Sequence, residues 1–186
     1  MSCEDKTHLY DLLTACKELV RTGWMARGVP PAIGESVAEH SWEAAILAYI
    51  LAEELKKRGA AISSERAAVL ALFHDILEGL TGDLPKYSSE KLGYAARRLL
   101  ENKALGDVCL LGGEEVVKEW MDARTVEARI ARLADYLSTY LQARRYLAAG
   151  YPGVEEILES TRDAAENLAR LLGLQELLEK IVNRKG

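Results

Sequence analysis

Apolar residues recur at steps of three and four along most of the chain, the spacing that places them on one face of an α-helix. Residues 7–21 show the pattern clearly, with apolar side chains at Leu9, Leu12, Leu13, Cys16, Leu19 and Val20. No segment shows the period-two alternation expected of a half-buried strand. The pattern therefore predicts an all-α fold.

Glycine and proline residues interrupt this pattern and mark where helices end. Residues 22–35 hold three glycines and two prolines and are predicted to form a long loop, and residues 79–85 are predicted to form a turn. Further helices are predicted over residues 36–57, 65–78, 89–101, 114–122, 125–148, 154–172 and 174–184. Since no repeat, low-complexity tract or linker separates them, we expect a single domain over residues 1–186.

Polar side chains interrupt one of the most apolar segments. Residues 67–80 are nearly all apolar apart from His74, Asp75 and Glu78. Burying unpaired carboxylates costs several kcal/mol each, and a bound metal ion would compensate them. A helix through residue 78 would carry all three side chains on one patch of its surface. Asp135 repeats the pattern as an acid set into another apolar helix.

A structural explanation competes for each of these residues taken alone. A single histidine on an apolar helix is more often a hydrogen-bonded core residue than a metal ligand. His40 follows a capping box formed by Ser36 and Glu39, so it is expected in the first turn of a helix. The adjacent pair His74 and Asp75, an acid one turn later and this second histidine together favour a metal site.

Two strings of residues carry a resemblance to a known family. The first is ESVAEHS at residues 35–41, and the second is HDILEGLTGDLP at residues 74–85. Together with Asp135, they resemble the HD-domain superfamily, and more narrowly its 5'-deoxynucleotidase branch. The resemblance covers about residues 8–148 and implies an HD-domain helical bundle, to which the helices at about 154–184 are added.

This resemblance also implies one divalent metal ion and hydrolysis of (deoxy)nucleoside 5'-monophosphates to nucleoside and phosphate. The implied metal ligands are His40, His74, Asp75 and Asp135. Two imidazoles and two carboxylates suit Mn, Co, Fe, Zn or Mg, and ligand type alone does not choose among these metals. The implied catalytic carboxylates are Glu78, which would orient or deprotonate the attacking water, and Asp83, which would assist departure of the sugar oxygen. An aspartate in a turn such as that around Asp83 is also a common turn residue.

The residues that bind substrate are less well defined by the resemblance, which extends to Arg21, Trp24 and Arg27. It implies that Trp24 lines the substrate pocket and stacks on base or sugar, with packing in the core as the alternative. Some family members have arginine immediately before this tryptophan, where this chain has Gly23. The candidates for the phosphate-binding cation are therefore, in order, Arg27, Arg21 and Lys91.

Composition limits the partners. The net charge of −5 lacks the basic excess expected of a protein that coats nucleic acid. No apolar run approaches the roughly 20 residues that a membrane-spanning helix needs, and the N-terminus does not resemble a secretory signal. We therefore expect a cytoplasmic protein that binds neither nucleic acid nor membrane. Related proteins suggest a homodimer. The apolar C-terminal helices are expected either to cover the core or to form the dimer interface.

Two other functions fit part of the pattern. HD-type hydrolases of guanosine tetraphosphate, (p)ppGpp, resemble HDxxED, whereas Glu78 is followed here by Gly79, so a nucleotide pyrophosphohydrolase is the second choice. The sites of HD-type cyclic-nucleotide phosphodiesterases contain several more histidines, whereas His8 is the only other histidine in this chain, so this function is not expected. The alternative of another class is a metal-stabilised nucleotide-binding module without turnover, which has no need of the acids Glu78 and Asp83.

Overall fold

The computed structural model describes residues 6–182, and the regular elements within this range are all helical. Two isolated bridges, Thr7 with Val108 and Val20 with Ser36, are the only β-type pairings among these residues. The predicted all-α, single-domain fold is therefore confirmed.

The helices follow the predicted segments closely. The N-terminal elements are α1 (Leu9–Glu18), α2 (Thr22–Met25), α3 (Val37–Lys57), α4 (Ser64–Phe73) and α5 (Glu78–Thr81). The C-terminal elements are α6 (Lys86–Asp107), α7 (Glu114–Asp122), α8 (Val126–Ala148), the 3-10 segment η2 (Pro152–Val154), α9 (Glu155–Leu172) and α10 (Gln175–Val182).

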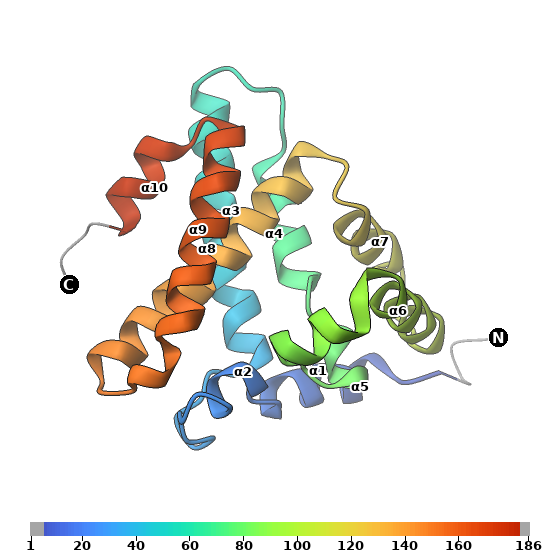
Figure 1. The fold of residues 1–186 in the computed structure, drawn as a ribbon. Coiled ribbons are helices and arrows are strands. Elements are labelled where there is room, and N and C mark those ends of the chain that lie inside the picture. The colour runs from blue at the N-terminus through green and yellow to red at the C-terminus, as the bar shows by residue number, and fades with distance from the viewer. Residues whose placement is uncertain (1–5, 183–186) are drawn as a thin grey trace.

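Helices α3, α4 and α8 form the centre of the molecule, and α9 packs along α8 (Figure 1). Their apolar faces meet in the main core, where Leu51, Leu70, Leu133 and Leu137 are fully buried. Leu178 of α10 is buried against the same core, so the C-terminal helices cover it. In Figure 1, α9 and α10 lie on one side of this centre, and α6 and α7 on the other.

The start of α3 is set by the predicted capping box, which is confirmed. The Ser36 hydroxyl accepts a hydrogen bond from the backbone N–H of Glu39 at 3.1 Å, and the Glu39 carboxylate accepts one from the backbone N–H of Ser36 at 2.7 Å. These bonds satisfy two donors that a helix start leaves unpaired. As a result, His40 lies in the first turn of α3.

The helix predicted over residues 65–78 is wrong in its second half, because α4 ends at Phe73. In a continuing helix, the carbonyl of Ala71 would accept from the N–H of Asp75. Here that carbonyl accepts instead from Nδ1 of His74 at 2.6 Å. The next turns are tighter, since the N–H of Glu78 bonds to the carbonyl of Asp75, three residues back.

Three smaller differences concern the ends of elements. The predicted loop at residues 22–35 contains the short helix α2, and the predicted turn at residues 79–85 begins within α5. Helix α6 is longer than residues 89–101 and is bent at Gly93, whose φ of 75° breaks its regular geometry. Glycine adopts this left-handed conformation without the steric cost that a side chain would bring.

Candidate metal centre

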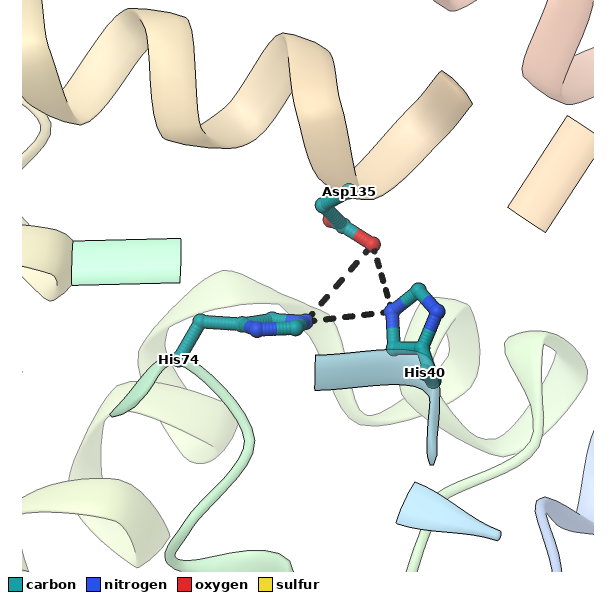
Figure 2. A group of neighbouring side chains, drawn as sticks. All are labelled: His40, His74 and Asp135. Carbon is teal, nitrogen blue, oxygen red and sulfur yellow. Dashed lines mark hydrogen bonds and ion pairs between the residues drawn. The ribbon is translucent and has the colours of Figure 1, made fainter. Parts of the chain in front are cut away.

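The four predicted metal ligands come together from three parts of the chain. His40 extends from α3, His74 and Asp75 follow the end of α4, and Asp135 extends from α8. Figure 2 shows that His40, His74 and Asp135 point toward one another between these helices. One donor atom from each of these three residues lies within 4.8 Å of the other two, although His40 and Asp135 are 95 residues apart in sequence.

The distances place four donor atoms around one small volume. The Nε2 atoms of His40 and His74 are 3.2 Å apart, and Oδ1 of Asp135 lies 3.1 Å from the first and 3.7 Å from the second. Oδ2 of Asp75 lies 2.9 Å from Nε2 of His74 and 3.8 Å from Nε2 of His40. His40 has no exposed surface, so it forms the floor of this cluster.

Hydrogen bonds on the far side of each imidazole fix which nitrogen faces the cluster. Nδ1 of His74 donates to the carbonyl of Ala71, which can only accept. Nδ1 of His40 lies 3.2 Å from the hydroxyl of Ser138, and this hydroxyl donates its own proton to Glu43 at 2.9 Å. The hydroxyl oxygen therefore accepts from Nδ1 of His40. Since both Nδ1 atoms are protonated, the Nε2 atom of each ring directs a lone pair into the cluster when that ring is neutral, as metal-binding histidines do.

The charges around the cluster favour a positive charge within it. Burial acts to lower the pKa of His74, but the charge and hydrogen bond of Asp75, together with Asp135, raise it to about 9. Burial and the nearby guanidinium of Arg21 lower the pKa of His40 to about 4. Burial acts to raise the pKa of Asp75, but the facing His74 holds it below its usual range. In the metal-free site, a proton on His74 thus supplies the positive charge that the two carboxylates require.

These features fit a divalent cation at the same place. Two lone pairs 3.2 Å apart repel unless a positive centre lies between them, and two carboxylates adjoin them. Imidazole nitrogens and carboxylate oxygens are the usual donors for first-row divalent metals in proteins. The residues present therefore match the donor set that such an ion requires.

Two further acids lie beside the cluster. Glu78 is the first residue of α5, and its Oε2 atom is buried without a hydrogen-bond partner among the described residues. Burial, with the charges of Asp75 and Asp83, raises the pKa of Glu78 to about 10. Asp83 follows α5, and its Oδ2 accepts hydrogen bonds from the backbone N–H and the hydroxyl of Thr22. Both acids therefore belong to the wall of the candidate site.

A cavity of about 370 Å³ opens above the cluster. His74, Asp75, Asp135, Glu78 and Asp83 line its inner part. Helices α6, α7 and α8 supply the outer walls, which include Tyr94, Arg97, Arg98, Trp120, Arg132 and Tyr136. Acids, cations and aromatic rings therefore surround one space, which suits a ligand with an anionic group and a ring.

Comparison with known proteins gives the family. A model of the HD domain matches residues 13–171. The chain belongs to the HD-domain family. The 5'-deoxynucleotidase YfbR of Escherichia coli O1:K1 is 34% identical over 145 residues, which cover 73% of this HD-domain chain and 72% of that protein. The corresponding protein of Shigella dysenteriae shows the same identity and coverage.

Solved structures agree with this HD-domain fold. A conserved hypothetical protein from Pyrococcus furiosus superposes with a TM-score of 0.78 at 35% identity, covering 92% of this chain and 98% of that one. The PH0347 protein from Pyrococcus horikoshii gives 0.76 at 28% identity, with coverages of 91% and 94%. An HD-domain phosphohydrolase from Listeria innocua gives 0.70 at 17% identity over 96% and 92% of the two chains, a likeness of fold alone.

These comparisons bear on three of the predictions. The predicted HD-domain family, the helical HD fold and the class of metal-dependent phosphohydrolase are confirmed. HD domains bind divalent metal ions, and the cluster of His40, His74 and Asp135 offers a site for one. Among the helices of residues 6–182, none is long and apolar enough to cross a membrane.

The HD-domain cavity does not contain all of the residues predicted to bind substrate. Arg21 lines it, but Trp24 is only 1% exposed and donates from Nε1 to the carboxylate of Glu35 at 3.1 Å. Trp24 also meets the ring of Tyr146 edge to face. The indole of Trp24 therefore belongs to the core, which is the alternative that the sequence left open, and it does not line the cavity.

Two predicted phosphate-binding cations also lie elsewhere. Arg27 forms an ion pair with Glu156 of α9, outside the residues that line the cavity. Lys91 lies with its ammonium group 5.5 Å from the ring centre of Tyr87, and it does not line the cavity either. Of the three candidates, Arg21 alone contributes to the cavity wall. Arg21 donates to the hydroxyl of Thr139 at 3.1 Å.

Several residues around the HD-domain site were not predicted. Ser138 and Glu43 fix the orientation of His40, and Trp120 and Arg132 line the cavity. Arg132 and Ser138 each lie three residues from Asp135 on the same predicted helix, and Glu43 lies three residues from His40, so helical spacing was a usable signal for all three. Trp120 reaches the site through the packing of α7, a helix that carries none of the predicted ligands.

Proposed function

We propose that the protein is a metal-dependent 5'-nucleotidase that hydrolyses (deoxy)nucleoside 5'-monophosphates to nucleoside and phosphate. The observation that carries the proposal is the convergence of two Nε2 lone pairs and two carboxylates below a cavity that also contains the unpartnered carboxyl of Glu78. The similarity to 5'-deoxynucleotidase YfbR supports the substrate class.

One divalent ion, whether Mn, Co, Fe, Zn or Mg, is proposed to be held by His40, His74, Asp75 and Asp135. When bound, such an ion lowers the pKa of a coordinated water and neutralises charge on the phosphoryl group. The hydrogen bonds from Nδ1 of His40 to Ser138 and from Nδ1 of His74 to Ala71 orient both imidazoles for this role.

Glu78 is proposed to orient the attacking water and to accept its proton. Its raised pKa reflects burial and the charges of Asp75 and Asp83, and a divalent cation beside these acids offsets their charge. The Glu78 carboxyl then ionises more readily and can act as a base near neutral pH. Its unpartnered Oε2 is the atom available for this contact.

Asp83 is proposed to assist departure of the sugar oxygen. The two hydrogen bonds from Thr22 hold its carboxylate on the cavity wall beside Glu78. A purely structural role, in which Asp83 only fixes α2, makes a different prediction: Asp83→Asn would then lower stability and leave kcat unchanged in the fraction that folds. A fall in kcat at unchanged metal content supports the catalytic role.

The experiment that tests the function is an assay of phosphate release from deoxyribonucleoside and ribonucleoside monophosphates with each of the five metals. We expect turnover of at least one monophosphate, abolished in Glu78→Gln while metal content is retained. Release of pyrophosphate from (p)ppGpp without turnover of monophosphates would replace the proposal with a pyrophosphohydrolase. Binding of monophosphates without turnover would indicate the non-catalytic module.

A homodimer is also proposed, with α3 as its interface. Trp42, Ile46, Tyr49 and Ile50 follow one another at helical spacing on the outer face of α3, and all four are exposed. The C-terminal helices cover the core of their own chain, whereas this face of α3 leaves apolar side chains exposed for a second copy to bury. Sedimentation of the wild type against Ile46→Glu tests the interface, and the cytoplasmic location stays a prediction.

A further inference from the structure

Arg132 differs from the other arginines of the cavity in its partners. Arg98 forms an ion pair with Asp122, Arg21 lies 3.8 Å from the carboxylate of Glu35, and Arg97 donates to Ser89. Among the described residues, the one interaction of the Arg132 guanidinium is with the ring of Trp120, 4.8 Å from its centroid. Arg132 therefore lines the cavity as a cation without an acidic partner.

Its position on α8 directs Arg132 toward the metal cluster. Residues three apart on a helix share a face, so Arg132 lies one turn before Asp135, the ligand contributed by the same helix. The side chains of both residues line the cavity. An anion bound beside Asp135 would therefore lie within reach of this guanidinium.

Trp120 provides the support that holds Arg132 in place. The indole comes from the end of α7, and its ring centre is 5.0 Å from that of His74. The guanidinium of Arg132 lies over the same indole, so Trp120 connects the cation to a metal ligand. A planar guanidinium on an aromatic face keeps its N–H edges available for hydrogen bonds.

The simpler explanation is that the Arg132 stem merely covers the apolar surface of Trp120, as long cationic side chains often do. Two observations oppose it. Arg132 lines the cavity instead of the outer surface, and it stays over the indole although Asp135 is one helical turn away. Its charge is thus kept separate from the carboxylates, as a site for an incoming anion requires.

We propose that Arg132 binds the scissile phosphate of the substrate through its N–H groups, and that Trp120 is the positioning residue that holds the guanidinium in place. This assignment rests on the proposed function, since it identifies the cation that recognises the phosphate in the same site. Arg132 replaces Arg27 and Lys91, which lie outside the cavity, in this role.

The test uses binding of inorganic phosphate to the metal-loaded protein, measured by titration calorimetry, alongside KM and kcat for a monophosphate. Loss of a charge-assisted, bidentate contact predicts that Arg132→Gln weakens phosphate binding by about 10- to 100-fold. Arg132→Lys keeps the charge without the planar fork and should recover part of this loss. Arg129→Gln, which changes an exposed arginine of the same helix outside the cavity, is the matched control and should change binding by less than about twofold.

Trp120 is tested by rescue. Trp120→Leu removes the aromatic surface and should weaken phosphate binding several-fold, whereas Trp120→Phe keeps an aromatic face and should retain most of the affinity. Metal content, measured by mass spectrometry, should be unchanged in every variant. A merely structural role for Trp120 predicts that both changes lower stability without separating phosphate affinity from metal content.

The results that overturn the inference are distinct from those that overturn the function. Unchanged phosphate affinity in metal-loaded Arg132→Gln and Arg132→Lys would exclude the proposed contact, as would an equal loss in Arg129→Gln. Absence of phosphate binding to the wild-type metal-loaded protein would also overturn it. If no monophosphate is hydrolysed, the proposed function fails, but phosphate binding still decides the role of Arg132.

Discussion

The Nε2 atoms of His40 and His74 lie 3.2 Å apart, although Nδ1 of each ring is hydrogen bonded in the opposite direction. Without a metal ion, a proton on His74, whose pKa is raised to about 9, balances the carboxylates that adjoin the two imidazoles. The protein holds them there through the hydroxyl of Ser138 and the carbonyl of Ala71. A metal ion that binds this site takes the place of the His74 proton, which links metal binding to the stability of the native state.

Metal loading should therefore stabilise the fold. A ligand that binds only the native state at 100 times its Kd adds about 2.7 kcal/mol to the free energy of unfolding. Thermal melts of chelator-treated protein with and without Mn²⁺ measure the shift in Tm. His74→Ala should abolish the shift, and His8→Ala, which changes the exposed histidine outside the site, should retain it. An equal shift in both variants would contradict the ligand set.

Metal affinity should rise with pH. Because the pKa of His74 is raised to about 9 in the metal-free site, this group is protonated at neutral pH and its proton competes with the metal. The apparent affinity should therefore increase between about pH 6 and pH 9, with proton release on binding. Calorimetry in two buffers of different ionisation enthalpy measures the number of protons released. A value of zero at pH 7 would contradict the prediction.

Removal of the Ser138 hydroxyl should weaken metal binding. Ser138→Ala leaves Nδ1 of His40 without its acceptor and frees the ring to change tautomer, and losses of such supporting bonds typically cost about 10- to 100-fold in metal affinity. Ser160→Ala is the matched control, because its hydroxyl bonds only to the carbonyl of Ile157 within α9. Equal metal affinities in the two variants would show that the orientation of His40 does not depend on Ser138.

Glu35 should make stability depend on pH. Burial raises its pKa to about 7, although Arg21 and the hydrogen bond from Trp24 oppose this. The native state then holds the Glu35 proton more tightly than the unfolded chain, so this contribution to stability is complete below about pH 4.5 and is lost as the pH rises through about 7. The loss is on the order of 3 kcal/mol at most.

Glu35→Gln provides the comparison, because the amide keeps an acceptor for Trp24 and does not titrate. Between pH 5 and pH 8, the free energy of unfolding of the wild type should fall relative to that of this variant. Urea unfolding at the two pH values measures it. A difference that does not vary with pH would show that Glu35 ionises normally in the native state.

The helical fold and the pair of residues at the centre of the site could be predicted from the sequence, because the patterns that indicate them are local. Periodic apolar residues specify α3 and α8, and the pair His74 and Asp75 is conspicuous within an apolar segment. The break after Phe73 was not accessible, because it depends on a bond between the His74 imidazole and the Ala71 carbonyl that competes with the helix itself.

The substrate-binding residues were harder to predict because their orientation depends on distant partners. A tryptophan in a glycine-rich loop can face a pocket or the core, and Trp24 faces inward because the buried carboxyl of Glu35 accepts its N–H. Arg27 lies outside the cavity because it forms an ion pair with Glu156, which is 129 residues later in the sequence. The orientations of these side chains depend on tertiary packing, which a local sequence pattern does not describe.

Hydrogen bonds from Thr22 to Asp83 join the segment that carries Arg21 to the segment that carries Glu78. These hydrogen bonds hold the two segments together at the base of the cavity. The rim of the cavity includes the bent helix α6, in which the exposed Tyr94 follows Gly93. The proposed metal ligands and the residues of this rim therefore lie in different segments of the chain. If the proposed function holds, substitutions in the rim are expected to change which nucleoside is accepted while the proposed metal ligands stay in place.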